Sequence, residues 1–588
     1  MTEGRIFGIN GPVVKVKGSD AFEMQEMVYV GEEELIGEVI GVTSETTIVQ
    51  VYEETTGLKV GEIVKGTGAP LSITLAPGIL SGIFDGIERP LVDIRNLSGA
   101  FIARGVKVNH LDERRTWDTV IKVKAGDAVE SGDVIAATQE TSLIEHRVMI
   151  PPGIRGVVEW AAVSGSYTIS EVIAKVKTDN GIVDITMKQE WPIKTARPYI
   201  KRQAIEKPLV TGQRIIDTMF PLAKGGAAAV PGGFGTGKTM TQHQIAKWCD
   251  ADIIVYIGCG ERGNEMTQVL EEFSELIDPK SNRPLLDRTM LIANTSNMPV
   301  AAREASIYTG VTIAEYYRDM GYDVALMADS TSRWAEALRE ISGRLEEMPA
   351  EEGFPAYLAS RLSQFYERAG YVTNLNGTEG SVSIIGAVSP QGGDFSEPVT
   401  QNTKRFIRCF WALDKSLAYS RHYPAIHWLS SYSEYIDDLT KWYSENVSKD
   451  FMEKRGRMMA ILQEESSLME IVKLIGADVL PDSQKVTLEV ARAIRLGFLQ
   501  QNAFHADDTY VPLEKQNKMM DTILLLDDRM KEMVEKGIVF SKIAETGIVE
   551  DIIRIKYTIG NNDIEAPFHE LQLKINETFD SLAAQRRE

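Results

Sequence analysis

Apolar and polar residues alternate between glycine turns near the start of the chain. Runs of this kind lie at residues 5–10, 12–17, 26–30, 35–40 and 46–52. A period of two is typical of strands with one buried face, and short strands joined by tight turns favour a closed barrel. We therefore predict a small β-barrel of about five or six strands over residues 1–70.

The next stretch, residues 71–99, is rich in Gly and Pro and predicts a connector into a second β-rich segment over residues 100–200. The turns of this segment carry a repeated Gly-Asp pair at residues 124–135. This rhythm is similar to that of lipoyl and biotinyl carrier barrels, which present a modifiable Lys on a hairpin tip. Residues 141–149 offer no Lys at that place. We therefore expect a barrel-like insert used for contacts, without an attached cofactor.

Apolar runs typical of buried strands alternate with helical patterns over residues 201–430. The runs lie at residues 227–230, 252–258, 288–293, 322–328 and 381–388, and helical spacing occurs at residues 265–277 and 301–320. Such alternation favours a mostly parallel sheet with helices on both faces. It predicts an α/β domain in which ligands bind outside the carboxyl ends of the strands.

The last part of the chain, residues 431–588, is charged, with apolar residues at three- and four-residue spacing. The helical patterns cover residues 434–469, 485–501, 513–536 and 568–584. This periodicity predicts an α-helical C-terminal domain. The predicted fold class is thus multidomain, with an N-terminal β-barrel, a β-rich insert, a central α/β domain and a helical end.

The composition argues against several classes of protein. The 588 residues carry a formal net charge of −21, which disfavours nucleic acid or an anionic membrane as the main surface partner. Only three cysteines occur, Cys249, Cys259 and Cys409, without CxxC spacing, so we expect reduced thiols and no zinc site. The sequence shows no signal-peptide layout and no long apolar run. We therefore expect a cytoplasmic chain that works at a membrane only through other subunits.

One glycine-rich stretch carries the clearest chemical signal. It fits the pattern Gly, four residues, Gly-Lys-Thr, and comprises Gly232, Gly233, Phe234, Gly235, Thr236, Gly237, Lys238 and Thr239. Glycines let the backbone aim successive N–H groups inward, and the helix expected from Lys238 adds the positive end of its dipole. Lys238 would reach the β- and γ-phosphates of a nucleotide, and Thr239 would bind Mg²⁺. The alternative is an ordinary glycine turn before a helix.

Two carboxylates follow predicted strands of the α/β domain. Asp329 comes directly after one strand, where it could join Thr239 in the Mg²⁺ shell, partly through water. Glu261 follows another strand and could orient a water for attack on the γ-phosphate, while its neighbour Arg262 neutralises phosphate charge. The alternatives are a helix N-terminal acid for Glu261 and, for Arg262, an ion pair with Glu265 or with an acid at an interface.

A hydrolytic site of this kind also uses an arginine finger, commonly worth ~10³–10⁵ in rate. The chain offers many arginines, including Arg333, Arg339, Arg361 and Arg368, but no spacing selects one of them. We therefore predict that a neighbouring chain supplies the arginine. The nucleotide would then lie at a subunit boundary of an oligomer.

Further motifs accompany the glycine loop. They are Gly260-Glu-Arg-Gly-Asn-Glu-Met266, Ala328-Asp-Ser-Thr-Ser-Arg-Trp-Ala-Glu-Ala-Leu-Arg-Glu-Ile-Ser342, Gly353-Phe-Pro-Ala-Tyr-Leu-Ala-Ser-Arg-Leu362, Ser389-Pro-Gln-Gly-Gly-Asp-Phe-Ser-Glu-Pro398 and Phe410-Trp-Ala-Leu-Asp414. Together with the loop they closely resemble the catalytic A subunit of V-type and A-type rotary ATPases. The resemblance covers essentially the whole chain and implies a RecA-like P-loop NTPase core. The insert over residues 100–200 separates this family from the related F-type β subunit.

The resemblance also implies an assembly. ATP would lie at A/B boundaries in a ring of three A and three B subunits, with the arginine finger supplied by B. Central-stalk subunits, a peripheral stalk and an ion-conducting membrane sector would complete it on the cytoplasmic face of a membrane. ATP and ADP with Mg²⁺ would be substrate and product. Tyr423 and Phe504 match the family's adenine pocket, with aromatic core packing as the alternative for both.

Two positions depart from the family pattern. Many eukaryotic relatives carry Cys within the phosphate loop, where this chain has Thr236, so we expect no disulfide switching. The counterpart of the F-type acidic loop that faces the rotor is residues 476–485, which hold fewer acids. Contact with a rotor at this place would therefore not rest on a strongly acidic patch.

Three functions compete at this point. The first is Mg²⁺-ATP hydrolysis or synthesis coupled to rotation and ion transport, with Glu261, Lys238 and Arg262 as catalytic residues. The second is a structural subunit that binds nucleotide without turning it over, which the intact set of Lys238, Thr239 and Glu261 disfavours. The third is a hexameric nucleic-acid motor, which the acidic composition and the insert disfavour.

Overall fold

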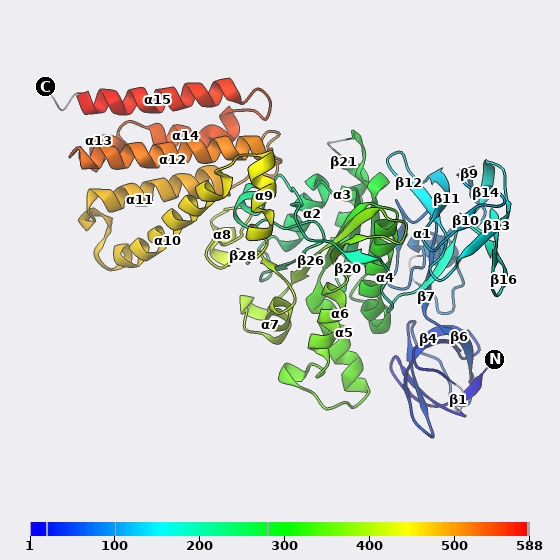
Figure 1. Cartoon of the computed structure of the whole chain (residues 1–588). Coiled ribbons are helices and arrows are strands. Elements are labelled where there is room, and N and C mark those ends of the chain that lie inside the picture. The colour runs from blue at the N-terminus through cyan, green and yellow to red at the C-terminus, as the bar shows by residue number, and fades with distance from the viewer. Residues whose placement is uncertain (1, 19–21, 100–101, 279–280, 585–588) are drawn as a thin grey trace. The chain divides into compact units, whose positions relative to one another are not determined.

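A computed structural model gives the fold of the chain (Figure 1). It describes residues 2–18, 22–99, 102–278 and 281–584. The chain forms two compact units. The first comprises Met1–Ala204, Lys224–Ala229 and Ala251–Ile407, and the second comprises Ile205–Ala223, Val230–Asp250 and Arg408–Glu588.

The first unit begins with a closed barrel. In barrel order its strands are β1 (Glu3–Asn10), β2 (Val13–Lys17), β5 (Thr47–Val51), β4 (Leu35–Val42), β3 (Glu26–Val30) and β6 (Ile63–Pro70). Apolar residues that alternate along these strands fill the interior, among them the fully buried Val14, Val28 and Val49. The predicted N-terminal barrel is confirmed.

Two antiparallel sheets form the β-rich insert. Their orders are β10-β13-β15-β16 and β12-β11-β9-β14. The strands are β9 (Thr116–Ile121), β10 (Ala128–Val129), β11 (Val134–Gln139), β12 (Glu145–Met149), β13 (Gly156–Ala161), β14 (Gly165–Thr168), β15 (Ala174–Thr178) and β16 (Gly181–Ile185). The predicted β-rich insert is therefore confirmed, and it consists of two four-stranded sheets.

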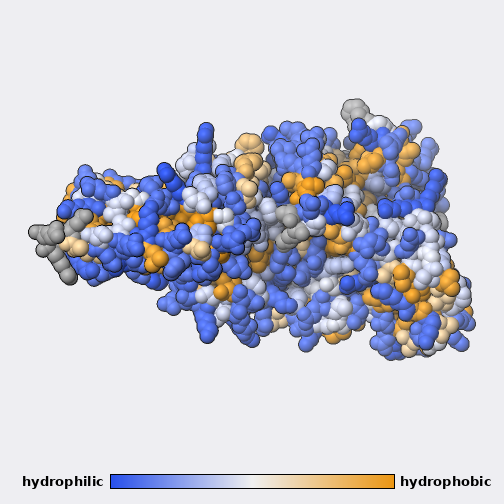
Figure 2. All heavy atoms as spheres, turned by 90° about the horizontal axis from the view of Figure 1, so that it is seen from above, coloured by the Kyte–Doolittle hydropathy of each residue, from blue (hydrophilic) through white to orange (hydrophobic). Residues whose placement is uncertain are grey.

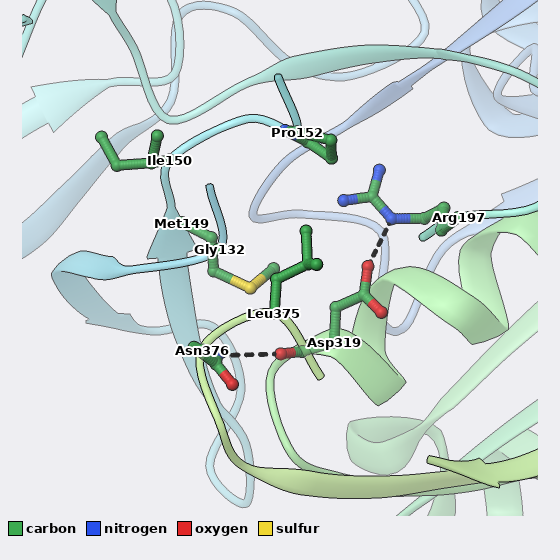
Figure 3. Close-up of a pocket in the computed structure, with 8 residues that line it drawn as sticks. All are labelled: Gly132, Met149, Ile150, Pro152, Arg197, Asp319, Leu375 and Asn376. Carbon is green, nitrogen blue, oxygen red and sulfur yellow. Dashed lines mark hydrogen bonds and ion pairs between the residues drawn. The ribbon is translucent and has the colours of Figure 1, made fainter. Parts of the chain in front are cut away.

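A buried polar network joins the chain after the insert to α4 (Val300–Asp319) of the α/β core. Arg197 Nε lies 2.6 Å from Asp319 Oδ2, and the backbone N–H of Arg197 donates to Glu315 at 2.9 Å. Figure 3 shows the Arg197–Asp319 pair beside a cavity of about 10 Å³. This volume is at the lower limit for one water, so the cavity is not a ligand site.

The α/β core of the first unit is a sheet of buried strands. The sheet has ten strands, and six neighbouring ones are, in order, β19 (Ala227–Pro231), β26 (Glu379–Val388), β24 (Asp323–Asp329), β20 (Ile253–Cys259), β23 (Thr289–Asn294) and β8 (Ile83–Phe84). The pairs from β26 to β8 are parallel, as the apolar runs predicted. The last strand was not predicted, because β8 is a short piece of the stretch taken as a connector. Helix α4 is buried along its length, from Ala301 to Asp319.

The second unit is mainly helical. Its longer helices are α2 (Lys238–Trp248), α9 (Ile436–Asn446), α10 (Phe451–Ile475), α11 (Asp482–Ala493), α12 (Leu513–Glu535), α14 (Ile548–Thr558) and α15 (Glu565–Ala584). Helix α11 continues into a π-helical turn, η6 (Ile494–Leu499). The predicted helical C-terminal domain is confirmed.

Two details of the helical part differ from the prediction. The helix expected over residues 434–469 is interrupted at residues 447–450, where the hydroxyl of Ser448 donates to the carboxylate of Asp450. Such a side-chain bond competes with the helical backbone pattern. Helix α14 was not predicted, although it starts after Gly547 and its buried residues recur at helical spacing.

Hydrophilic residues cover most of the face seen in Figure 2. None of the helices over the described residues combines the length and the apolar character needed to span a bilayer. The thiols lie inside the fold: Cys259 and Cys409 are buried, and burial raises the pKa of Cys259 to about 12, which keeps it protonated.

Two buried lysines lie in the second unit. Lys515 Nζ donates to the carbonyl of Ile559 at 2.6 Å, and Lys556 Nζ donates to the carbonyl of Leu496 at 2.6 Å. The pKa of each lysine is lowered to about 8, mainly by burial and then by the nearby positive charge of Arg214. Both ammonium groups therefore carry their charge at a cost to stability.

We expect the free energy of unfolding to rise between about pH 8 and pH 10.5, because the folded chain has released protons that the unfolded chain still binds. The Lys556→Met variant should lose part of this rise, on the order of 1–3 kcal/mol over the window. Urea unfolding from about pH 7 to pH 10 measures the slope. Lys531→Met, at an exposed position of α12, is the control. Equal slopes in the two variants would contradict a lowered pKa of Lys556.

Candidate functional site

The glycine loop lies between β19 and α2. Gly237 has a φ of 89° at the start of α2, a left-handed conformation that favours glycine. A Cβ at Gly237 would lie 3.5 Å from the ring of Tyr423, so this ring stands directly beside the loop. The loop therefore presents backbone at the positive end of a helix, next to an aromatic side chain.

The lysine and one threonine of the loop bind its own backbone carbonyl groups. Lys238 Nζ lies 2.8 Å from the carbonyl oxygen of Gly232 and 3.1 Å from that of Gly233. The hydroxyl of Thr236 also donates to the Gly233 carbonyl, at 2.8 Å, and its side chain is buried. Thr239 is half-buried in the first turn of α2. This arrangement suits an anion held by backbone N–H groups and one ammonium.

A cavity of about 630 Å³ adjoins the loop within the second unit. The residues that line it include Met240, Gln244, Arg421, Tyr423, Phe504 and Tyr557. The two aromatic residues expected to form a base pocket thus line one cavity. Their side chains face solvent, with Tyr423 43% exposed and Phe504 90% exposed. The alternative of aromatic core packing therefore does not hold for either residue.

The carboxylates Glu261 and Asp329 lie at one edge of the sheet in the first unit. β20 and β24 are neighbouring parallel strands, with Gly258 opposite Asp329, and Glu261 follows directly after β20 and Gly260. Gly260 has a φ of 74°, and a Cβ there would lie 2.7 Å from Cβ of Arg333. Glycine is therefore required for the turn that aims Glu261.

The electrostatics of this pair are unusual. The pKa of Glu261 is raised to about 8, mainly by burial and then by the charge of Asp329 and a hydrogen bond with Glu265, while the charge of Arg333 opposes the rise. Asp329 is only 3% exposed, and the hydroxyl of Tyr256 donates to its Oδ2 at 3.1 Å. A carboxyl group with a strongly raised pKa beside a second carboxylate is a common feature of catalytic sites.

The arginines take different positions. Arg262 is exposed at the N-terminus of α3 (Gly263–Glu275). Arg333 lies 2.9 Å from Glu336. Arg368 is bound to the buried Glu315 at 2.6 Å. Arg368 therefore serves in a buried ion pair of the core. The positive charge of Arg333 lowers the pKa of Glu261.

A second cavity, of about 580 Å³, lies in the first unit. Arg361, Arg368 and Glu315 are among the residues that line it. Its buried charges are paired inside the fold, since Glu315 contacts Arg368 and lies 4.0 Å from Arg318. A closed network of this kind is typical of structural ion pairs.

The structure groups the predicted residues by unit. Lys238, Thr239, Tyr423 and Phe504 belong to the second unit, and Glu261, Arg262 and Asp329 belong to the first. Sequence reasoning missed Tyr256 and Arg421. A tyrosine inside an otherwise aliphatic strand was a usable signal, because a buried hydroxyl needs a partner. Arg421 carried no signal.

Four family models match the chain. The beta-barrel domain of the ATP synthase alpha/beta family matches residues 6–68, and the nucleotide-binding domain of that family matches residues 212–433. Residues 108–194 match the barrel-sandwich domain described for the alpha/beta subunits of ATP synthase. Residues 440–543 match the C-terminal domain of V and A type ATP synthase.

Individual proteins match over nearly the full length. The chain is 60% identical to the V-type ATP synthase alpha chain 2 of Clostridium tetani and 58% identical to the A subunit of the A-type ATP synthase of Methanopyrus kandleri. Each alignment covers 99% of this chain and 98% of the relative. Among solved structures, the assembled ATPase EscN of the enteropathogenic E. coli type III secretion system shares the fold. The TM-score is 0.64 at 21% identity, over 89% of this chain and 100% of that one.

The fold, the glycine loop and these matches define a P-loop nucleotide-binding protein of the ATP synthase alpha/beta type. Within that class, the chain belongs to the family of V-type ATP synthase alpha chains and A-type ATP synthase A subunits. The predicted resemblance is therefore confirmed.

We expect Asp329→Asn to lower the pKa of Glu261 below about 8, because the substitution removes a like charge beside it. The pKa should stay above the ordinary value of 4.5, since burial and Glu265 remain. Carbon-13 NMR of the metal-free chain, labelled at glutamate and titrated from about pH 5 to pH 9, measures the change. Asp323→Asn, at the opposite end of the same strand, is the matched control. An unchanged pKa in Asp329→Asn would show that the two carboxyl groups do not interact.

Proposed function

We propose that this chain is the catalytic subunit of a V/A-type rotary ATPase, which hydrolyses or synthesises ATP and couples the reaction to rotation and ion transport. The observation that carries the proposal is the glycine loop with the Lys238 ammonium over its backbone carbonyls, next to a cavity lined by Tyr423 and Phe504. A triphosphate and a flat base fit these two surfaces by charge and by shape.

The second unit binds the nucleotide in this proposal. Backbone N–H groups of the loop and the N-terminus of α2 hold the phosphates, and Lys238 neutralises charge on the β- and γ-phosphates. Tyr423 and Phe504 stack on the adenine, because stacking requires only an accessible flat face. Such positioning supplies much of the catalysis of phosphoryl transfer, which needs little covalent help.

The first unit supplies the acidic residues. Glu261 orients the attacking water, and Arg262 compensates charge on the phosphate. The hydroxyl of Thr239 and the carboxylate of Asp329 are hard oxygen donors of the kind that Mg²⁺ prefers, so these residues would hold the ion, partly through water. When bound, Mg²⁺ neutralises phosphate charge. The positive charge of Arg333 lowers the pKa of Glu261 and so favours the carboxylate form that this role requires.

A neighbouring B subunit supplies the arginine finger in the proposed ring of alternating A and B subunits. Central-stalk and peripheral-stalk subunits and a membrane sector that conducts H⁺ or Na⁺ complete the machine, with this chain on the cytoplasmic face of the membrane. The chain's own arginines support this division, since Arg368 is tied to Glu315 and Arg333 to Glu336. The substrate and product are ATP and ADP with Mg²⁺, and nucleic acid has no part.

A second candidate is a nucleotide-binding subunit of the same ring that does not turn ATP over. The raised pKa of Glu261 and the turn that places it beside Asp329 favour the catalytic role. A chain that only holds nucleotide has no need for a carboxyl group in this environment.

In the reconstituted ring, we expect Glu261→Gln to keep nucleotide binding while ATP turnover falls by roughly 10²–10³-fold or more, as for the loss of other preorganised polar groups. A coupled ATPase assay and a binding titration measure the two effects. Glu271→Gln, at an exposed position on α3, is the control and should turn over ATP like the wild type. Near-normal turnover in Glu261→Gln would reject Glu261 as the water-orienting residue.

The isolated chain should hydrolyse ATP at least ~10³-fold more slowly than the ring, because the arginine finger is absent. The same preparation should still bind ATP. Assays of the chain with and without B subunits test this. Robust hydrolysis by the chain alone would contradict the borrowed arginine.

A further inference from the structure

Arg214 is fully buried in the second unit, directly after Gln213, which lines the cavity. Its guanidinium group donates to the backbone carbonyl of Phe498, to the carboxylate of Asp508 and to the backbone carbonyl of Gln500, the last at 2.7 Å. The carbonyls belong to the end of the turn η6, where the helical pattern leaves carbonyl groups without backbone donors. One side chain thus closes the end of this turn.

A chain of hydrogen bonds leads from Arg214 to Phe504. The second oxygen of Asp508, Oδ2, accepts from the backbone N–H of Asn502 at 2.7 Å. The side-chain oxygen of Asn502 accepts from the backbone N–H of Phe504 at 3.0 Å. The backbone that carries Phe504 is therefore held through Asp508, and Asp508 is held by Arg214.

Gln501 connects Arg214 to the other aromatic residue. Its side-chain oxygen accepts from the backbone N–H of Arg214 at 2.9 Å, and its side-chain nitrogen donates to the carbonyl of Gly212 at 2.8 Å. The backbone N–H of Gln501 donates to the carbonyl of Tyr423 at 2.8 Å. Phe504 is thus connected to the side chain of Arg214, and Tyr423 is connected through Gln501 to the backbone of the same residue.

Packing does little to hold the ring of Phe504. Its side chain is 90% exposed, whereas that of Tyr423 is 43% exposed and is held in part by its neighbours. The position of each ring also depends on the backbone that carries it. The planar guanidinium group of arginine suits the task, because its fixed donors can satisfy several acceptors at once, which the single ammonium of lysine cannot reproduce.

We propose that Arg214 is a positioning residue that sets the distance between Tyr423 and Phe504 and thereby the affinity of the cavity for the base of ATP. The proposal rests on the proposed function, in which this cavity takes the adenine. The phosphates bind at the glycine loop, which Arg214 does not contact through any hydrogen bond found in the described residues. Loss of Arg214 should therefore weaken binding of the base and leave binding of the phosphates unchanged.

The test uses two probes on the full-length chain, ATP and tripolyphosphate, each with Mg²⁺ and measured by isothermal titration calorimetry. Arg214→Lys keeps the positive charge but loses the planar set of guanidinium donors. ATP should then bind about tenfold to a hundredfold more weakly, while tripolyphosphate should bind within about twofold of the wild type. Arg455→Lys is the matched control. Arg455 is another arginine of this unit that donates to a backbone carbonyl, that of Met219, and its variant should bind both probes like the wild type.

Asp508→Asn provides a second variant that keeps the shape of the side chain. An asparagine can accept from Arg214 or from the N–H of Asn502, but its nitrogen cannot accept from either, so one of the two bonds is lost. ATP binding should weaken severalfold, again without a change for tripolyphosphate. In the reconstituted ring, both variants should raise KM for ATP and leave kcat nearly unchanged.

The outcomes separate the proposals. Equal weakening of ATP and tripolyphosphate would show a general structural role and overturn the inference, as would wild-type ATP affinity in both variants. If Arg214→Lys does not fold, Asp508→Asn decides the matter by the same criterion. A wild-type chain that binds tripolyphosphate but gains no affinity from the base of ATP would overturn the assignment of the cavity itself, independently of Arg214.

Discussion

The first unit depends on the register between two parallel strands. β20 and β24 run side by side, so the residues that follow their carboxyl ends meet at one edge of the sheet whatever their charges. Both strands are buried along their length, and this packing holds Glu261 and Asp329 together against their mutual repulsion. The repulsion between the two carboxyl groups contributes to the raised pKa of Glu261. The chemistry proposed for this edge therefore follows from the sheet.

In the second unit the buried charges are mainly positive. It gathers Arg214, Lys515 and Lys556 around Asp508, and backbone carbonyls serve as many of their partners. Removing one partner of such a network leaves another buried group without its hydrogen bond or counter-charge. The resulting loss in the free energy of unfolding is larger than the net contribution of the intact pair. The same buried groups support a surface that itself faces solvent. Rigid support below an exposed binding surface is a common way to preorganise a site.

Local patterns explain which parts of the fold could be predicted from the sequence. The alternation in the first strands and the aliphatic runs of the core are local signals, and they predicted the barrel and the parallel sheet. β8 was missed because its two residues become a strand only through β23, which is distant in sequence. The glycine loop and the acids after strands were recognisable by position. The network of Arg214 was not, because its partners lie almost three hundred residues further along the chain. Tertiary packing determines such pairs, so no periodic pattern in the local sequence indicates them.

The closed barrel at the start of the chain has a consequence for synthesis. β1 pairs with β2 and also with β6, so the sheet closes on itself within the first seventy or so residues. Domains generally fold as units during translation, with the N-terminal one first. A nascent chain that carries this barrel therefore exposes no open strand edge there while the rest of the protein is still being made. Neighbouring nascent chains then have no template at this domain for pairing by strand addition.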